Sequence, residues 1–191
     1  MGTNGESCPS YLWAKPLTDE PRIKIIKSSE DLGVLPTTLG SYDPINWTPV
    51  DVHAQVVIDL LNAQWAAAAT QPSDGHREIE VYHANNPQTS SWSKAMFPTV
   101  HRRFPHLRPI LWAEWVDALS ASQEGSAKKQ GGDNMALRLL DFYEKVKWEQ
   151  EIGYVRPSID TTKAQQMSLT MREMQAVGPV WTDLWLRQWG W

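Results

Sequence analysis

The sequence has only one cysteine, Cys8, among 191 residues, so it cannot form a framework of internal disulfides and it suits a reducing compartment. No apolar run approaches the roughly 20 residues that a membrane-spanning helix needs. Residues 1–10 have neither the basic nor the apolar region of a signal peptide. These absences predict a soluble protein of the cytoplasm that has no membrane partner.

Other absences argue against three kinds of binding site. The net charge of −4, with both signs mixed along the chain, provides no basic stripe for nucleic acid. The five histidines show no HExxH motif and no short spacing to cysteine or aspartate, so we expect no metal site. None of the 11 glycines forms a GxGxxG turn, whose backbone amides would bind a pyrophosphate. We therefore expect no cofactor and, in particular, no affinity for NADPH.

Tryptophan is abundant, with 11 residues against three phenylalanines and five tyrosines. So much large aromatic surface favours a deep core, a small-molecule pocket or a subunit contact over a polar binding surface. Trp181, Trp185 and Trp189 recur at every fourth position near the end of the chain, which predicts a last helix with an aromatic face.

The longest apolar segment, residues 46–69, predicts a short strand followed by a long helix. Residues 46–50 alternate as in a strand, and Pro49 suits a strand end because it has no backbone donor. Asp51 is predicted to cap the helix that follows. Apolar residues then recur at helical spacing: Val52, Val56, Val57, Leu60, Leu61 and Ala63. We expect this helix to lie on a large apolar surface.

The remaining segments predict a fold that is α+β and predominantly helical. Residues 21–33 predict a strand or short helix ended by Gly33, and residues 79–84 and 107–112 predict strands. Helices are expected after Ser90 or Ser91, from Trp112, from Asn134, after Asp160, after Ser168 and from Pro179. The polar stretch 121–133 predicts a flexible loop. We expect residues 1–20 to be a disordered leader and residues 21–191 to be one domain.

Five segments resemble a known family when they are taken in order: INWTPVDVHAQVV, EVYHANNPQTSSW, RPILWAEWVDAL, MALRLLDFYE and WLRQWGW. Together they resemble the carboxy-terminal, substrate-side part of thioester reductase domains. These domains are extended short-chain dehydrogenase relatives found in fungal adenylate-forming reductases and polyketide synthases. In that family NADPH reduces a carrier-bound thioester. The resemblance covers roughly residues 23–191 and implies the substrate-binding part of the fold without its Rossmann half.

The resemblance also suggests which side chains face the substrate. It brings Trp47, Trp92, Trp112 and Tyr143 toward the acyl group, so these four are the predicted pocket walls. The family's Tyr-x-x-x-Lys spacing occurs twice, once in the irregular leader and once at Tyr143 and Lys147, late on a core helix. We interpret both occurrences as coincidences. Without a nucleotide site, hydride transfer has no donor.

Two histidines are candidate general acids or bases, since imidazole titrates near pH 6.5. His53 flanks the apolar face of the long helix, and His83 follows the predicted strand 79–84. Asn85 and Asn86, beside His83, can orient its ring or polarise a carbonyl, and we include both in the substrate-binding set. The alternative for each histidine is a structural role in a pocket wall or core. Met167, Met171 and Met174 share one helical face, for which core packing is the favoured interpretation.

Three functions remain open. The preferred hypothesis is a stand-alone, non-redox biosynthetic protein that binds a polyketide- or aminoacyl-derived, aldehyde-like intermediate and promotes its cyclisation or condensation. Holding one folded conformation lowers the barrier of such a step. The second is a docking module for a carrier protein or partner enzyme, and the third is an inactive, truncated fragment. The first is preferred because the tryptophan-rich pocket elements occur in a chain that cannot use them for hydride transfer.

A homodimer is also expected. In the resembled family, the long helix and the strand near Val81 pack against the cofactor-binding half, which this sequence lacks. Their apolar faces would therefore be open to water, and large exposed apolar patches are rare on monomers. We expect two copies to cover them, through the long helix and the helix that carries Trp181, Trp185 and Trp189.

Overall fold

The computed structural model describes residues 21–70, 79–126 and 134–191. Its helices are α1 (Pro21–Leu32), α2 (Val50–Thr70), α3 (Phe97–Arg103), α4 (Trp112–Ser126), α5 (Leu140–Glu151), α6 (Thr162–Met167), α7 (Leu169–Glu173) and α8 (Pro179–Gln188). Short 3-10 helices span Gly40–Tyr42 (η1) and Met135–Leu139 (η3), and a π-helix spans Trp92–Met96 (η2). The expected leader, residues 1–20, lies outside the described residues.

The fold class is α+β and mainly helical, as the sequence predicted. Four short strands form two pairs. Strand β1 (Val34–Pro36) runs parallel to β4 (Arg108–Ile110), and β2 (Pro44–Ile45) runs antiparallel to β3 (Ser90–Ser91). Gly33 adopts a φ of +69° directly after α1, a conformation that ends helices and that favours glycine. Over the described residues, no helix is both long and apolar enough to cross a membrane.

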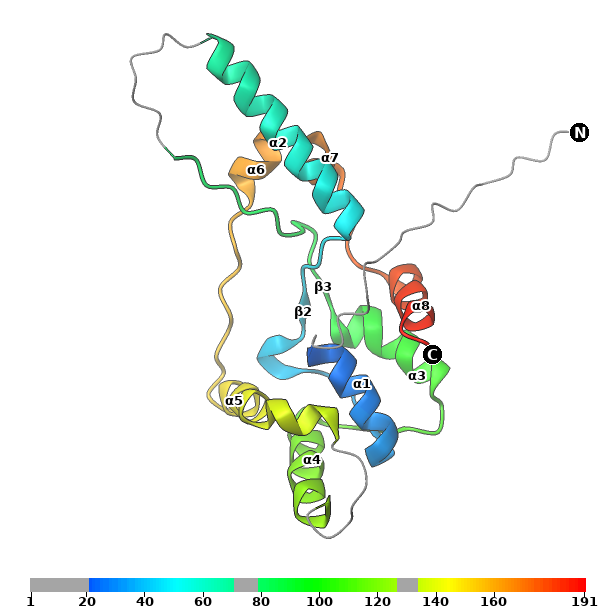
Figure 1. Cartoon of the computed structure of the whole chain (residues 1–191). Helices are drawn as coiled ribbons and strands as arrows, with labels where there is room; N and C mark the ends of the chain where they lie inside the picture. Colours follow the sequence, from blue (N-terminus) through cyan, green and yellow to red (C-terminus); the bar gives the residue numbers. More distant parts are fainter. Residues whose placement is uncertain (1–20, 71–78, 127–133) are drawn as a thin grey trace, which may run out of the picture.

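A main core forms where α1, α4 and α5 pack together, with α3 and α8 beside them (Figure 1). Its centre is aromatic. Trp112 stacks on Trp115 at 5.3 Å between ring centroids, and Tyr143 meets both rings edge-on. The buried indole nitrogens of Trp92 and Trp115 donate to Pro36 O at 2.9 Å and Ser29 Oγ at 3.0 Å. Much of the excess tryptophan is therefore used in packing.

The tryptophans of α8 also pack within the chain. Trp185 is buried, and its ring lies 5.3 Å from that of Trp47. Trp181 and Trp189 are half-buried against the main core. The aromatic face of this helix is therefore mostly covered by its own chain.

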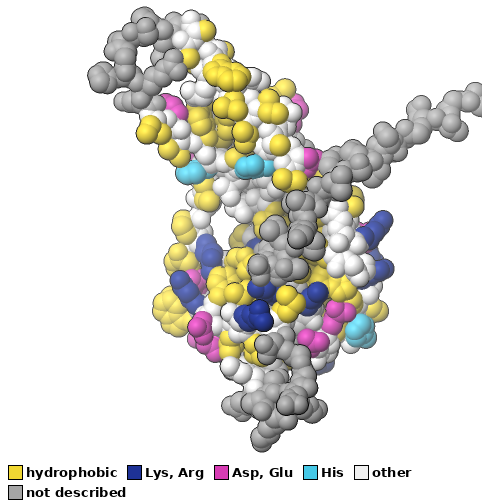
Figure 2. Space-filling model, in the orientation of Figure 1, with side chains coloured by type: hydrophobic (Ala, Val, Ile, Leu, Met, Phe, Trp, Pro, Cys, Tyr) yellow, Lys and Arg dark blue, Asp and Glu magenta, His cyan; other side chains and the backbone are white. Residues whose placement is uncertain are grey.

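A second, smaller cluster lies apart from the main core, where α2 packs on α6 and α7 (Figure 1). Its buried members are Val56, Ala164, Met171 and Met174, and we call it the α2 cluster. The expected core packing is confirmed for Met171 and Met174, whereas Met167 is 37% exposed. The opposite face of α2 is apolar and uncovered, and Figure 2 shows hydrophobic side chains gathered there.

Asn86 connects the two clusters. This side chain is 2% exposed, and its amide nitrogen donates to Trp47 O at 3.2 Å and to Gln175 O at 2.8 Å. Its carbonyl oxygen accepts from Gln88 N at 2.9 Å. The chain before α2, the segment before β3 and the loop before α8 are thus held together by one amide group.

The predicted start of the long helix is wrong in two respects. Residues 46–49 form no strand, because Asn46 O and Trp47 O accept from Asn86 instead of from a neighbouring strand. The helix begins at Val50, with His53 N donating to Pro49 O at 2.8 Å. Asp51 is therefore not the cap. It lies in the first turn, where its charge still complements the helix dipole.

Three further boundaries differ from the prediction. Residues 79–84 form no strand, because side-chain contacts with α2 and α6 replace strand pairing. The helix expected from Asn134 begins with a 3-10 turn and becomes α-helical only at Leu140. Helix α4 continues through residues 121–126 of the expected loop, and residues 127–133 lie outside the described part.

The other helix starts are confirmed. Ser91 Oγ accepts from Lys94 N at 3.2 Å and caps η2, and Ser168 Oγ accepts from Met171 N at 3.1 Å and caps α7. Asp160 Oδ1 accepts from Thr162 N just ahead of α6. Gly178 is the N-cap residue of α8, and Pro179 follows as its first residue.

Trp92→Phe should lower the free energy of unfolding by about 2–3 kcal/mol, because it opens a cavity and leaves the buried Pro36 carbonyl without its donor. Trp65→Phe is the matched control, since this side chain is 70% exposed and the same change should have little effect. Urea denaturation followed by circular dichroism measures both. Equal effects of the two variants would contradict the role given to Trp92.

Candidate functional site

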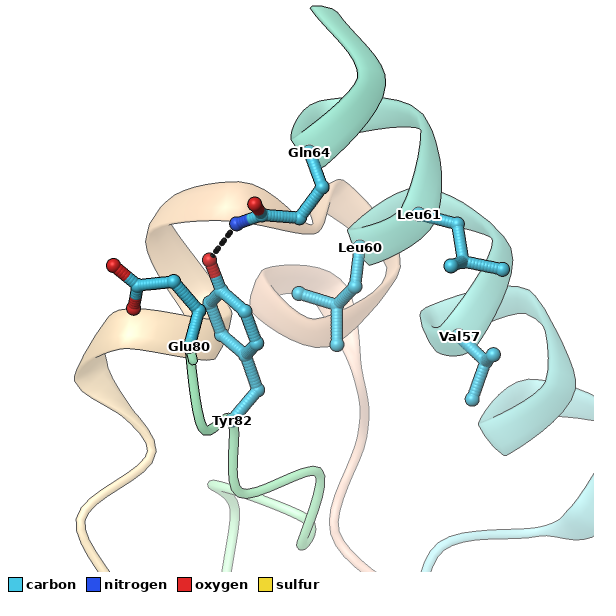
Figure 3. A pocket seen from close by; sticks show the side chains of 6 residues that line it. All are labelled: Val57, Leu60, Leu61, Gln64, Glu80 and Tyr82. Atoms are coloured by element: carbon cyan, nitrogen blue, oxygen red, sulfur yellow. Dashed lines mark hydrogen bonds between the residues drawn. The ribbon is translucent and has the colours of Figure 1, made fainter. Parts of the chain in front are cut away.

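An open groove of about 340 Å³ runs along α2 (Figure 3). Val57, Leu60, Leu61 and Gln64 of α2 form one side, and Glu80 and Tyr82 line the other. Leu60 and Gln64 point toward Tyr82, whereas Val57 and Leu61 point away from it. The groove is mostly apolar, with its polar groups on the Tyr82 side, and its volume lies within the range of small-molecule sites.

The polar side of the groove is a chain of contacts among side chains from three segments. Gln64 Nε2 is hydrogen-bonded to the Tyr82 hydroxyl, and Lys163 of α6 forms an ion pair with Glu80. The Lys163 ammonium also lies 5.3 Å from the centroid of the Tyr82 ring. An amide, a phenol and an ammonium group therefore surround one edge of an apolar surface. This combination suits a ligand with a hydrocarbon body and a carbonyl group.

Asp59 holds α2 in place over α7. Its carboxylate accepts from Ser168 Oγ at 2.7 Å, from Thr170 N at 3.2 Å and from Gln55 Nε2 at 3.0 Å. These hydrogen bonds, led by those from Gln55 and Ser168, lower the pKa of Asp59 from 3.8 to about 2. The position of the groove thus depends on an ionised carboxylate at the start of a short helix.

The four aromatic residues predicted as pocket walls lie in the main core. Trp92, Trp112 and Tyr143 are each at most 1% exposed, and Tyr143 Oη donates to Pro21 O at 3.0 Å. Trp47 is half-buried, 4.8 Å below the Arg22 guanidinium. The structure brings Trp112 and Tyr143 together, but none of the four lines the groove. Their part in substrate binding remains a prediction beside an observed packing role.

The polar candidates occupy three different settings. His53 is exposed on α2, and Asn86 is fully used as a tether. Asn85 is half-buried. His83 is exposed, and its Nδ1 lies 3.2 Å from Asp160 O. Because a carbonyl can only accept, Nδ1 must carry the proton of this bond. In the neutral ring Nε2 is then unprotonated and able to act as a base.

Sequence reasoning missed Tyr82, Gln64, Glu80 and Lys163. The signal for two of them was present, since Glu80 and Tyr82 alternate with Ile79 and Val81 in the segment that was predicted as a strand. Lys163 had no such signal, because it joins the site only through the packing of α6 on α2. Among the described residues, no group of three histidine, cysteine, aspartate or glutamate side chains is arranged to hold a metal ion.

Comparison with known proteins relates the chain to fungal biosynthetic enzymes. It is 34% identical over 174 residues to a carboxylic acid reductase of Neurospora crassa, 86% of this chain and 15% of that protein. It is 30% identical over 162 residues to 3-methylorcinaldehyde synthase of Talaromyces stipitatus, 84% of this chain and 5% of that protein. No protein-family model matches it.

A third relative is the non-reducing polyketide synthase tazA of Aspergillus terreus, which is 30% identical over 175 residues. This match covers 86% of the chain and 6% of the synthase. In each of these three comparisons, the chain therefore corresponds to a small part of a much larger protein. The matching regions are the carboxy-terminal reductase regions, as the sequence motifs suggested.

The contact between Asp59 and α7 should weaken in acid. The folded-state pKa of about 2 is below the ordinary 3.8, so this carboxylate stabilises the fold above about pH 4 and loses that effect as the pH falls toward 2. Asp59→Asn should therefore be less stable than the native chain at pH 7, and the difference should shrink between pH 4 and 2.

Urea titrations across this pH range measure that difference. Asp117→Asn is the control, since Asp117 is an exposed residue in a surface ion pair with Lys147 and its loss should have little effect. A difference between Asp59→Asn and the native chain that stays constant from pH 7 to pH 2 would contradict the role given to the carboxylate.

Proposed function

Because the chain is homologous to the carboxy-terminal reductase region of a fungal carboxylic acid reductase and of fungal non-reducing polyketide synthases, we propose that it binds an intermediate of secondary metabolism. The ligand is polyketide- or aminoacyl-derived and carries an aldehyde or ketone. It lies in the groove between α2 and Tyr82. Binding promotes its cyclisation or condensation without a nicotinamide cofactor on this chain.

The observation that supports this proposal is the pairing of an apolar wall with a polar edge in one groove. Leu60 offers hydrocarbon surface, and the Tyr82 hydroxyl and the Lys163 ammonium are donors that can hold a carbonyl oxygen. A long, flexible intermediate that is held at both ends loses the conformational freedom that opposes ring closure. Orientation of this kind can lower a barrier by several kcal/mol.

The proposed reaction is balanced without an oxidant or reductant. A base removes a proton from the carbon next to one carbonyl, and that carbon forms a bond with the carbon of a second carbonyl. The second carbonyl oxygen takes up a proton as its double bond becomes single. His83 is the proposed base, since Asp160 O holds its Nδ1–H and leaves Nε2 free.

A second candidate function is a docking module for a carrier protein or partner enzyme. The observation in its favour is the uncovered apolar face of α2, where Leu61 is 50% and Trp65 is 70% exposed. The two functions differ in what quenches tryptophan fluorescence. A small aldehyde should do so if the groove binds ligand, and only an added carrier protein should do so if the chain is a docking module.

Tyr82→Phe should reduce turnover of a synthetic polyketide aldehyde by about 10-fold, because it removes a donor while keeping the aromatic wall. The assay follows cyclised product by mass spectrometry and contains no nicotinamide cofactor. Tyr154→Phe, at a tyrosine that does not line the groove, is the matched control and should keep full activity. The absence of both binding and product with the native chain would end the proposal.

His83→Ala should lower turnover by about 100-fold while leaving aldehyde binding intact, as expected for the loss of a general base. His106→Ala is its control, since His106 is exposed and contacts the Phe104 ring. Unchanged turnover in a folded His83→Ala protein would remove the histidine from the mechanism. Catalysis would then depend on the shape of the groove alone.

A further inference from the structure

The face of α2 that turns away from α6 and α7 is apolar along its length. Exposed fractions are 42% for Val57, 50% for Leu61 and 70% for Trp65, and Val50 and Ile58 are also about half exposed. Together with Ala54 and Ala68, these residues recur at spacings of three and four. That spacing forms a continuous stripe on a helix and is the pattern by which helices pair.

The stripe is also uncharged. From residue 50 to residue 69 the only charged side chains are Asp51 and Asp59, and Asp59 is bound to α7 on the opposite face. A face without charge offers nothing to a strongly acidic or basic partner. It also meets no repulsion when it is brought against an identical face, as a two-fold axis requires.

We propose that two copies of the chain pair through α2, antiparallel, about a two-fold axis beside Leu61. In this register Leu61 lies opposite the partner's Leu61, and Val57 lies opposite the partner's Trp65. Ala54 then faces the partner's Ala68. Small residues meet near the ends, and a small branched residue meets the largest one, so the helix axes can approach to about 8–10 Å. A register centred one residue away would place the polar Asn62 or Leu60, which points toward Tyr82, on the axis.

The area is sufficient for a specific contact. Five large side chains at about half exposure present on the order of 500 Å², so two copies would bury about 1,000 Å² in total. This area lies at the lower end for specific interfaces, and we expect a dissociation constant in the micromolar range. Pairing leaves the polar side of the groove free, because Leu60 and Gln64 point toward Tyr82 and Leu61 points away (Figure 3).

Light scattering and sedimentation of the full chain at about 50 µM, well above a micromolar dissociation constant, should give twice the mass of 21.7 kDa. Leu61→Glu places two carboxylates together on the axis and should produce a monomer with an unchanged circular dichroism spectrum. Asn62→Glu is the matched control. It adds the same charge at the next exposed position, beside the stripe, and should remain dimeric.

A charge pair tests the register directly. Val57→Glu and Trp65→Lys should each weaken the dimer by about 100-fold or more, because one charge is buried without a partner. The double variant should recover to within about 10-fold of the native dimer, since each introduced carboxylate then faces the introduced ammonium group of the other copy. These measurements need no ligand, so they stand apart from the test of the groove.

Three results would overturn the proposal. A native chain that is monomeric at this concentration would show that the face is not paired with its own copy, whether or not an added carrier protein binds it. A dimer that survives Leu61→Glu would place the contact elsewhere. A double variant no tighter than either single variant would refute the antiparallel register.

Discussion

The position of α2 depends on one ionic contact between distant segments. Asp59 accepts hydrogen bonds from Ser168 and Thr170, 109 and 111 residues away in the sequence, and so holds the helix over α7. The buried surface beneath it is small, consisting of Val56 against Ala164, Met171 and Met174. A helix fixed on one side by so few contacts keeps its other side free. The groove and the exposed stripe both follow from this one-sided attachment.

Local chemistry made much of the fold predictable from the sequence. Ser91, Ser168 and Gly178 mark helix starts because a cap depends only on neighbouring backbone groups. The strand at residues 79–84 was mispredicted because alternation shows that a segment is extended but does not supply a pairing strand. Asn86 is the clearest case. Its amide replaces strand pairing at Asn46 and Trp47, and no local pattern announces that contact.

The candidate site was less predictable, for a related reason. Trp92, Trp112 and Tyr143 were assigned to a pocket by resemblance, and burial shows that they fill the main core. An aromatic stripe has the same periodicity in both settings. Lys163 reaches Tyr82 only because α6 packs against α2, a contact between segments far apart in the chain. Local sequence patterns do not encode such contacts.

The relation to large reductase-bearing enzymes gives the division of α2 a chemical meaning. The side of the helix that carries Leu60 and Gln64 faces polar groups able to hold a carbonyl, and the side that carries Leu61 and Trp65 is uniformly apolar. A substrate surface benefits from a few placed donors, because they fix orientation. A surface that meets another helix benefits from their absence, because each buried donor would need a partner. One helix can therefore serve both purposes only if its two sides differ in this way.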